Sequence, residues 1–251
     1  MSNRFFVDHS VFHQDSTEVL LAGDEAYHFC KVMRGKIGDS LILFDGTGKY
    51  AHGIAESIQK EGVRVRITEM FADDVESPFR LTVAAALPKG DRQRFLIEKL
   101  AELGVARFIP VQMERSVARA NDAVILRLRR YVIEAAKQCG RNVLMEITDE
   151  IPMGKLNDLF VAETAEKFLL HPVALGNVGQ TTPRQILTDT PFSVGTPGKI
   201  IILAGPEGSF TDQEVDLALR KGFRPLDLGK RILRTETACI AAAALFLTFA
   251  G

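Results

Sequence analysis

The stretch IILAGPEGSFTDQEV, residues 201–215, passes from an apolar run through a Gly-Pro-Glu-Gly turn into a polar segment. The apolar run predicts a buried strand, and Thr211 with Glu214 has the spacing of a capping box, so a helix is expected directly after the turn. A strand followed at once by a helix is the unit of a parallel sheet, and open sheets of this kind bind ligands at the carboxyl ends of their strands. The stretch therefore predicts both the fold class and the place of a binding site.

The chain beyond residue 78 repeats this alternation of strands and helices. Apolar runs predict strands at residues 80–88, 106–112, 166–176, 199–208 and 226–229, and helical periodicity predicts helices at residues 91–104, 122–140, 212–222 and 235–249. Such alternation is typical of βαβ units. We therefore predict an α/β domain with a mostly parallel sheet over residues 79–251.

The N-terminal part of the chain has a different pattern, with short strands around one helix. Residues 39–58 predict a β-hairpin, and residues 24–34 predict a helix with Asp24 as its N-cap. We predict a small β-rich domain over residues 1–72. An acidic segment that ends in proline, residues 73–78, is the expected linker.

Charge and cysteine content limit the classes of function. Lys and Arg total 31 against 32 Asp and Glu, a net charge of -1, so any contact with nucleic acid must be local. Three widely spaced cysteines fit neither a disulfide framework nor a zinc site and favour a reducing compartment, and Cys139 and Cys239 are expected to be inert core thiols. The N-terminus lacks the apolar core of a signal peptide, and the apolar C-terminal run is shorter than the roughly 20 residues of a membrane span. We predict a cytoplasmic protein without metal or membrane contact.

The turn at residues 205–208 is compatible with an anion site, because glycines before a helix N-terminus can hold a phosphate. The details argue against this, since the chain lacks GxxxxGK[ST] and GxGxxG patterns and Glu207 places a negative charge in the turn. A nucleophile elbow is absent as well, because no serine or cysteine lies between the glycines. The remaining alternative is a tight turn in which glycine serves backbone geometry alone.

A second stretch, LDLGKRILRTETACIAAAA at residues 226–244, places a basic loop between a short strand and the final apolar helix. One of the two threonines in its Thr-Glu-Thr cluster is a candidate N-cap of that helix. Lys230, Arg231 and Arg234 lie between elements that are expected to be buried. Because unpaired buried charge is costly, these three cations need a partner.

Both stretches closely resemble the paired C-terminal motifs of the RsmE family of ribosomal RNA uridine-N3 methyltransferases, within the SPOUT superfamily. The resemblance spans nearly the whole chain. It rests on GPEGSFTDQEV and LGKRILRTETA together with RFF at Arg4–Phe6, HFCKVMRGKIGD at 28–39, EKLAELGV at 98–105, ERSV at 114–117 and EAAKQCGR at 134–141. It implies an α/β fold with a SPOUT-type mostly parallel sheet and a C-terminal trefoil knot, preceded by a small PUA-like β-barrel that binds RNA.

The resemblance also implies S-adenosylmethionine as the methyl donor, bound by three loops at residues 170–172, 203–208 and 228–238. Apolar side chains suit the faces of adenine, and glycines permit close approach of the backbone. The cofactor-binding residues implied in this way are Leu170, His171, Pro172, Leu203, Gly205, Pro206, Gly208, Leu228, Gly229, Ile232, Leu233, Thr237 and Ala238. The sequence departs from the family at Ser209, where glycine is more common.

The implied activity is methylation of N3 of a specific uridine in small-subunit (16S) ribosomal RNA. Loss of the N3 proton leaves a negative charge on uracil, which a nearby cation stabilises. We assign that part to Arg234 and leave the base or orienting group open between Glu207 and Glu236. The spacing of residues does not itself encode the target base.

Ribosomal RNA and a second copy of the chain are the implied partners. The RNA-binding residues expected from basic clusters and from the resemblance are Arg4, Arg64, Arg66, Lys89, Arg115 and Arg141. Because the chain has no basic excess, we expect it to recognise a structured target, the assembled 30S-type subunit. The Ala-rich final helix offers an apolar surface for a homodimer, or it backs the sheet within one chain. Two other functions stay open: a non-catalytic RNA-binding ribosome-assembly factor of the same fold, and a small-molecule enzyme that uses a nucleotide.

Overall fold

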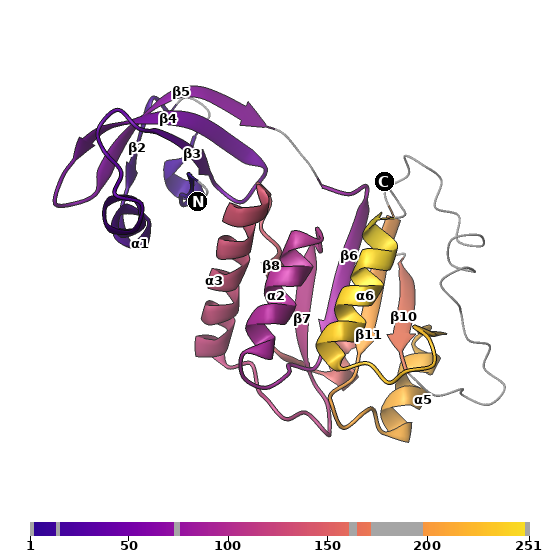
Figure 1. Cartoon of the computed structure of the whole chain (residues 1–251). Coiled ribbons are helices and arrows are strands. Elements are labelled where there is room, and N and C mark those ends of the chain that lie inside the picture. Colours follow the sequence, from indigo (N-terminus) through magenta and orange to yellow (C-terminus); the bar gives the residue numbers. More distant parts are fainter. Residues whose placement is uncertain (1–2, 14–15, 73–75, 161–164, 172–197, 249–251) are drawn as a thin grey trace. The chain divides into compact units, whose positions relative to one another are not determined.

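The computed structural model describes residues 3–13, 16–72, 76–160, 165–171 and 198–248 (Figure 1). The chain forms two compact units. The first unit comprises residues 1–76 and 133–144, and the second comprises residues 77–132 and 145–251. The end of the long helix α3 (Asp122–Cys139) is therefore grouped with the N-terminal residues, a feature that the sequence did not predict.

The first unit is built on a five-stranded sheet. Its strands are β1 (Arg4–Phe6), β2 (Glu18–Leu21), β3 (Ser40–Phe44), β4 (Lys49–Ile58) and β5 (Val63–Ala72), in the order β1-β3-β4-β5-β2. β1 pairs with β3 in parallel and the other pairs are antiparallel, which confirms the predicted hairpin of β3 and β4. Along β5, Val63 and Val65 are buried while Arg64 and Arg66 point away from the core, because side chains alternate along a strand.

The helical segment of this unit starts earlier than predicted. α1 (Gly23–Tyr27) has Ala22 as its N-cap, without a side-chain hydrogen bond, and continues as the π-helical turn η2 (His28–Val32). The prediction of Asp24 as the N-cap is therefore wrong. Asp24 lies in the first turn, where an acidic side chain also interacts favourably with the helix dipole. A short 3-10 turn, η1 (His9–Val11), precedes β2.

The second unit confirms the predicted mostly parallel sheet, since every strand pair recorded among its described residues is parallel. Its strands are β6 (Phe79–Ala85), β7 (Arg107–Gln112), β8 (Glu146–Ile147), β9 (Ile151–Pro152), β10 (Glu166–Leu170), β11 (Gly198–Ala204) and β12 (Arg224–Leu226). Their order is β12-β10-β11-β6-β7-β8, with β9 paired to β7. The strand predicted at residues 226–229 is shifted, since β12 ends at Leu226. Pro225 is tolerated there because β12 is the edge of the described sheet.

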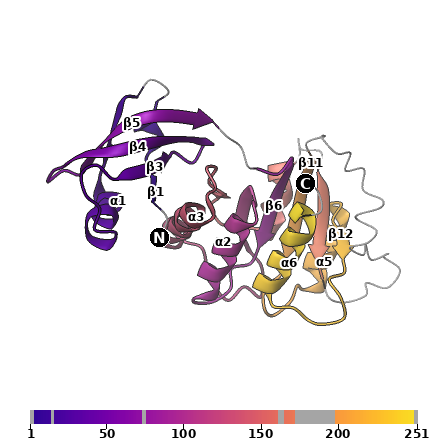
Figure 2. The same cartoon turned by 45° about the horizontal axis from the view of Figure 1, so that its top comes forward.

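Helices cover both faces of this sheet. They are α2 (Arg92–Glu102), the first part of α3, η3 (Met153–Phe160), α5 (Asp212–Arg220) and α6 (Thr235–Thr248). α6 packs against α2, β6 and β11 (Figures 1 and 2), and its Phe246 ring lies 5.0 Å from the Phe168 ring of β10. On the other face, Val215 and Ala218 of α5 share a core with Leu203 of β11. α6 therefore backs the sheet within one chain, one of the two alternatives given for it above. Among the described helices none has both the length and the apolar character needed to cross a bilayer.

The strand register brings the carboxyl ends of four strands to one edge. Leu170 of β10 pairs with Ala204 of β11 and with Leu226 of β12, and Ala204 also pairs with Ala85 of β6. The segments that follow these strands therefore leave the sheet next to one another. The turn at residues 205–208 lies at this edge, as the sequence predicted.

Candidate active site

The segment from β11 through the turn into α5 folds as its sequence dictates. Thr211 is the N-cap of α5, in extended conformation, and its hydroxyl accepts a hydrogen bond from the Glu214 amide at 3.3 Å. The Glu214 carboxylate accepts one from the Thr211 amide at 2.9 Å. The predicted capping box is thus confirmed, and it fixes where the turn ends.

The turn itself is tightly packed. A Cβ added to Gly205 would lie 2.8 Å from the Phe210 ring, so only glycine fits there without movement of that ring. Ser209 has a φ of 62° and donates its amide to the Pro206 carbonyl at 2.9 Å. This left-handed conformation favours glycine, which explains why the resembled family more often carries glycine at the position of Ser209. Arg115 Nη1 donates to the Gly208 carbonyl at 3.0 Å and so supports the turn from outside.

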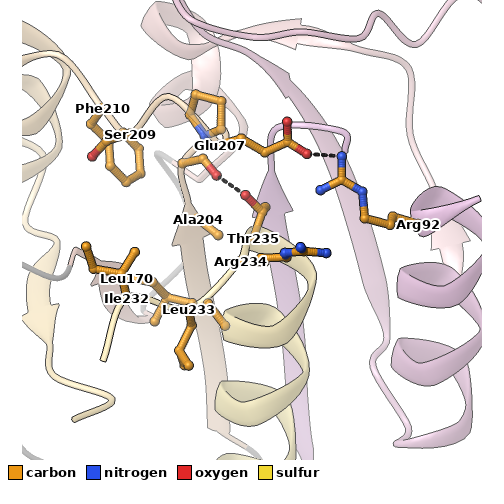
Figure 3. A pocket seen from close by; sticks show the side chains of 13 residues that line it. Arg92, Leu170, Ala204, Glu207, Ser209, Phe210, Ile232, Leu233, Arg234 and Thr235 are labelled. Carbon is orange, nitrogen blue, oxygen red and sulfur yellow. Dashed lines mark hydrogen bonds and ion pairs between the residues drawn. The ribbon is translucent and has the colours of Figure 1, made fainter. Parts of the chain in front are cut away.

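A cavity of about 500 Å³ opens beside the turn (Figure 3). Its walls come from the ends of β10 and β11, from the turn, from the segment that leads into α6, and from the start of α2. The lining residues are Arg92, Leu170, Ala204, Gly205, Pro206, Glu207, Ser209, Phe210, Ile232, Leu233, Arg234, Thr235 and Ala238. A smaller cavity of about 60 Å³ shares Leu170, Leu233 and Ala238 with it.

Most of the predicted cofactor-binding residues meet at these two cavities. Leu170, Gly205, Pro206, Ile232, Leu233 and Ala238 line the larger one, and His171, Leu228 and Gly229 line the smaller one. Gly208 and Thr237 are exposed and line neither cavity, and Pro172 lies outside the described residues. Leu203 is fully buried in the core on the α5 face, because strand alternation turns Ala204 rather than Leu203 toward the larger cavity.

The predicted catalytic residues have different surroundings. Glu207 and Arg234 line the larger cavity, whereas Glu236 is buried in the first turn of α6 with 4% of its surface exposed. Arg92 forms an ion pair with Glu207, and its Nη1 lies 3.9 Å from Glu236 Oε1. Glu236 Oε2 has no hydrogen-bond partner among the described residues. One guanidinium from α2 thus faces two carboxylates, one from the turn after β11 and one from the first turn of α6 (Figure 3 shows the ion pair with Glu207).

Arg92 and Phe210 line the site but were not predicted, and Ala204 and Thr235 lie in two of the predicted donor loops without having been named as binding residues. Arg92 belongs to a basic cluster in the sequence, but nothing local indicates that it faces the turn. The strand order could have placed Arg92 near the turn, because α2 follows β6 and β6 is the neighbour of β11. Thr235, one of two candidate N-caps, is instead the first residue of α6, and its hydroxyl donates to the Gly205 carbonyl at 2.8 Å.

The two cysteines expected to be core thiols differ. Cys239 of α6 is fully buried, and burial, with a smaller contribution from the nearby Glu236 charge, raises its pKa to about 12. Cys139 is exposed, so the prediction of a core thiol is wrong there. The cause is its position at the last residue of α3, beyond the apolar face of that helix.

The arginines of the first unit that were expected to bind RNA are mostly engaged within the protein. Arg64 pairs with Glu18, Arg66 with Glu56 at 2.5 Å, and the almost fully buried Arg141 with Glu76 at 2.5 Å. Arg4 is half-buried, donates to the Asn142 side chain and lies over the Phe44 ring, and burial lowers its pKa. In the second unit, Lys89 and Arg115 are exposed.

Comparison with known proteins gives consistent matches. Residues 75–247 match the family described as RNA methyltransferase domain, and residues 21–68 match the RNA methyltransferase PUA domain. The chain is 31% identical to Ribosomal RNA small subunit methyltransferase E of Synechocystis sp., covering 90% of this chain and 71% of the relative, and 30% identical to the Bacillus subtilis protein of that name, covering 88% and 86%. The solved structure of Ribosomal RNA small subunit methyltransferase E from Neisseria gonorrhoeae bound to S-adenosyl methionine matches with a TM-score of 0.82 at 31% identity, over 98% of this chain and 96% of that one. A Legionella pneumophila methyltransferase in complex with the cofactor SAM matches with a TM-score of 0.84 at 31% identity, over 99% and 98%.

Proposed function

The chain belongs to the family of ribosomal RNA small subunit methyltransferase E, and on this premise we propose that it methylates N3 of a specific uridine in small-subunit (16S) ribosomal RNA with S-adenosylmethionine. The observation that carries the proposal is the cavity at the carboxyl edge of the parallel sheet. Residues that the sequence assigns to the donor and residues that it assigns to catalysis line the same space.

The cavity has the properties that this donor requires. Its volume of about 500 Å³ lies within the roughly 300–1,000 Å³ of small-molecule sites. Leu170, Ile232 and Leu233 offer apolar surface for a nucleoside, and Gly205 leaves backbone accessible. We propose that these four residues hold the donor together with Pro206 and Ala238. When bound, S-adenosylmethionine supplies an activated methyl group.

The charged residues of the cavity have separate tasks in this proposal. Arg234 stabilises the negative charge that uracil carries once N3 has lost its proton. Glu207 lines the cavity and is the favoured group to accept or orient that proton, because Glu236 does not reach the cavity surface. Arg92 fixes Glu207 through its ion pair and at the same time faces the buried Glu236.

Two measurements test the function. Calorimetry is expected to detect binding of S-adenosylmethionine to the folded protein, and mass-spectrometric mapping of 16S ribosomal RNA is expected to detect one methylated uridine that depends on the protein. A folded protein that binds no donor contradicts the proposal. Arg234→Ala is expected to lower turnover strongly while the donor affinity stays within about twofold; near-normal turnover removes Arg234 from the mechanism.

We also propose that the chain is a cytoplasmic homodimer that acts on the assembled 30S-type subunit. The same proposal includes domains at residues 1–72 and 79–251 and a C-terminal trefoil knot. Sedimentation tests the dimer, since a clean monomer of 27.7 kDa at micromolar concentration contradicts it. Equally fast methylation of a bare oligonucleotide contradicts the preference for an assembled target.

A further inference from the structure

The loop between β12 and α6 carries cations that the methyl-transfer site does not use. Lys230 and Arg231, the two residues that follow Gly229, are both exposed. The loop is locally ordered, because the Gly229 amide donates to the Asp227 carboxylate at 2.7 Å and Gly229 adopts a φ of 102°. The two cations are therefore presented to solvent on a defined backbone.

Several other cations of the second unit are neutralised within the protein. Arg224 pairs with Glu166 and Arg119 with Glu150, for example. No acidic side chain among the described residues pairs with Lys230 or Arg231. The sequence predicted a partner for the cations of this loop because the loop was expected to be buried. That expectation is wrong, since Lys230, Arg231 and Arg234 are all exposed; Lys230 and Arg231 are instead accessible to an anion from outside the protein.

The position of the pair points to the partner. Arg231 lines the smaller cavity, and Ile232, which follows it, lines the larger one and is 87% exposed. Arg231 thus lies at the rim of the site, and Lys230 directly precedes it in the exposed loop. A nucleic acid brings phosphates within reach of that rim, whereas a symmetric contact between two copies of this loop would bring like charges together.

We infer that Lys230 and Arg231 bind backbone phosphates of the substrate RNA beside the target nucleotide. The inference rests on the proposed function for the identity of the anion. We therefore expect RNA contacts at Lys230 and Arg231 rather than at Arg64, Arg66 and Arg141, because acidic side chains already pair with those three arginines.

The double variant Lys230→Ala/Arg231→Ala tests the inference. RNA affinity is measured between 50 and 200 mM salt, and each lost phosphate contact reduces the slope of log K against log salt by about 0.7–0.9. The slope is therefore expected to fall by about 1.5, with weaker binding at every salt concentration. Arg220→Ala/Lys221→Ala is the matched control, because these two exposed cations line neither cavity of the site. The control is expected to keep the wild-type slope.

Three results overturn the inference. An unchanged slope in a folded Lys230→Ala/Arg231→Ala protein shows that no phosphate is bound there. Weaker binding of S-adenosylmethionine with an unchanged slope assigns the pair to the donor carboxylate, and altered sedimentation with an unchanged slope assigns it to a contact between copies. The salt slope does not depend on catalysis, so failure of the methylation assay would refute the proposed function separately.

Discussion

The cation shared by two carboxylates at the site gives the sharpest stability prediction. Arg92 is bound to Glu207 on the turn and lies 3.9 Å from the buried Glu236. Removing the guanidinium by Arg92→Ala leaves the buried Glu236 without the cation that faces it, and one of its oxygens has no partner among the described residues. We therefore expect most of the cost of Arg92→Ala to come from Glu236, although the ion pair with Glu207 is the shorter contact.

The magnitude follows from separation and exposure. Two unit charges 3.9 Å apart interact by about 4 kcal/mol at an effective dielectric constant near 20. Because the Arg92 side chain is 32% exposed, water screens part of this, and we expect a coupling free energy of about 1–2 kcal/mol between Arg92 and Glu236. The Glu207 side chain is 30% exposed, so its coupling to Arg92 is expected at about 0.2–1 kcal/mol.

A pair of double-mutant cycles measures both couplings. The variants are Arg92→Ala, Glu236→Gln, Glu207→Gln and the two doubles, and the free energy of unfolding comes from urea titrations. The chain contains no tryptophan, so far-UV circular dichroism is the signal. Arg92→Ala is expected to cost about 2 kcal/mol in the wild-type background and less than 1 kcal/mol beside Glu236→Gln. A larger coupling to Glu207 than to Glu236 would refute the reasoning.

Three further predictions concern the turn and the thiols. Thr211→Ala removes the N-cap of α5 and is expected to lower the free energy of unfolding by about 1 kcal/mol in a urea titration, whereas a value under a few tenths would contradict the role of the capping box. Gly205→Ala drives a methyl group into the Phe210 ring, so calorimetry is expected to show at least tenfold weaker binding of S-adenosylmethionine; unchanged affinity would mean that the ring yields freely. Iodoacetamide at pH 8 is expected to label Cys139 in the native protein and to spare Cys239, whose pKa is raised to about 12, and mass spectrometry of labelled peptides reads out the difference.

The parts of the site that depend on local signals were predictable from the sequence. The capping box at Thr211 and Glu214 needs only residues three apart, and the parallel sheet follows from alternation of strands and helices. The edge where the site lies follows from that topology. Local pattern therefore sufficed for the turn, for the start of α5 and for the direction in which the cavity opens.

The parts that depend on pairing across the chain were not predictable. Arg92 reaches the turn because β6 lies beside β11, and the buried Arg141 pairs with Glu76, which is far away in the sequence. A basic cluster looks the same in the sequence whether its cations pair with acidic side chains or are exposed to water. The exposure of Cys139 could not be predicted for a related reason, since an apolar helical pattern does not show which face of the helix the last residue occupies.

The contacts around the turn explain how a chain can keep Ser209 in a conformation that costs an L-residue roughly 1–2 kcal/mol. Arg115 holds the Gly208 carbonyl and Thr235 holds the Gly205 carbonyl, and each belongs to a different segment of the second unit. The turn is therefore fixed from two sides before any ligand arrives, and the strain at Ser209 persists because these contacts outweigh it. A fixed turn favours binding of the donor proposed above, because little conformational entropy remains to be lost when a ligand enters. The strained serine is thus consistent with a site organised for binding rather than with a flexible loop.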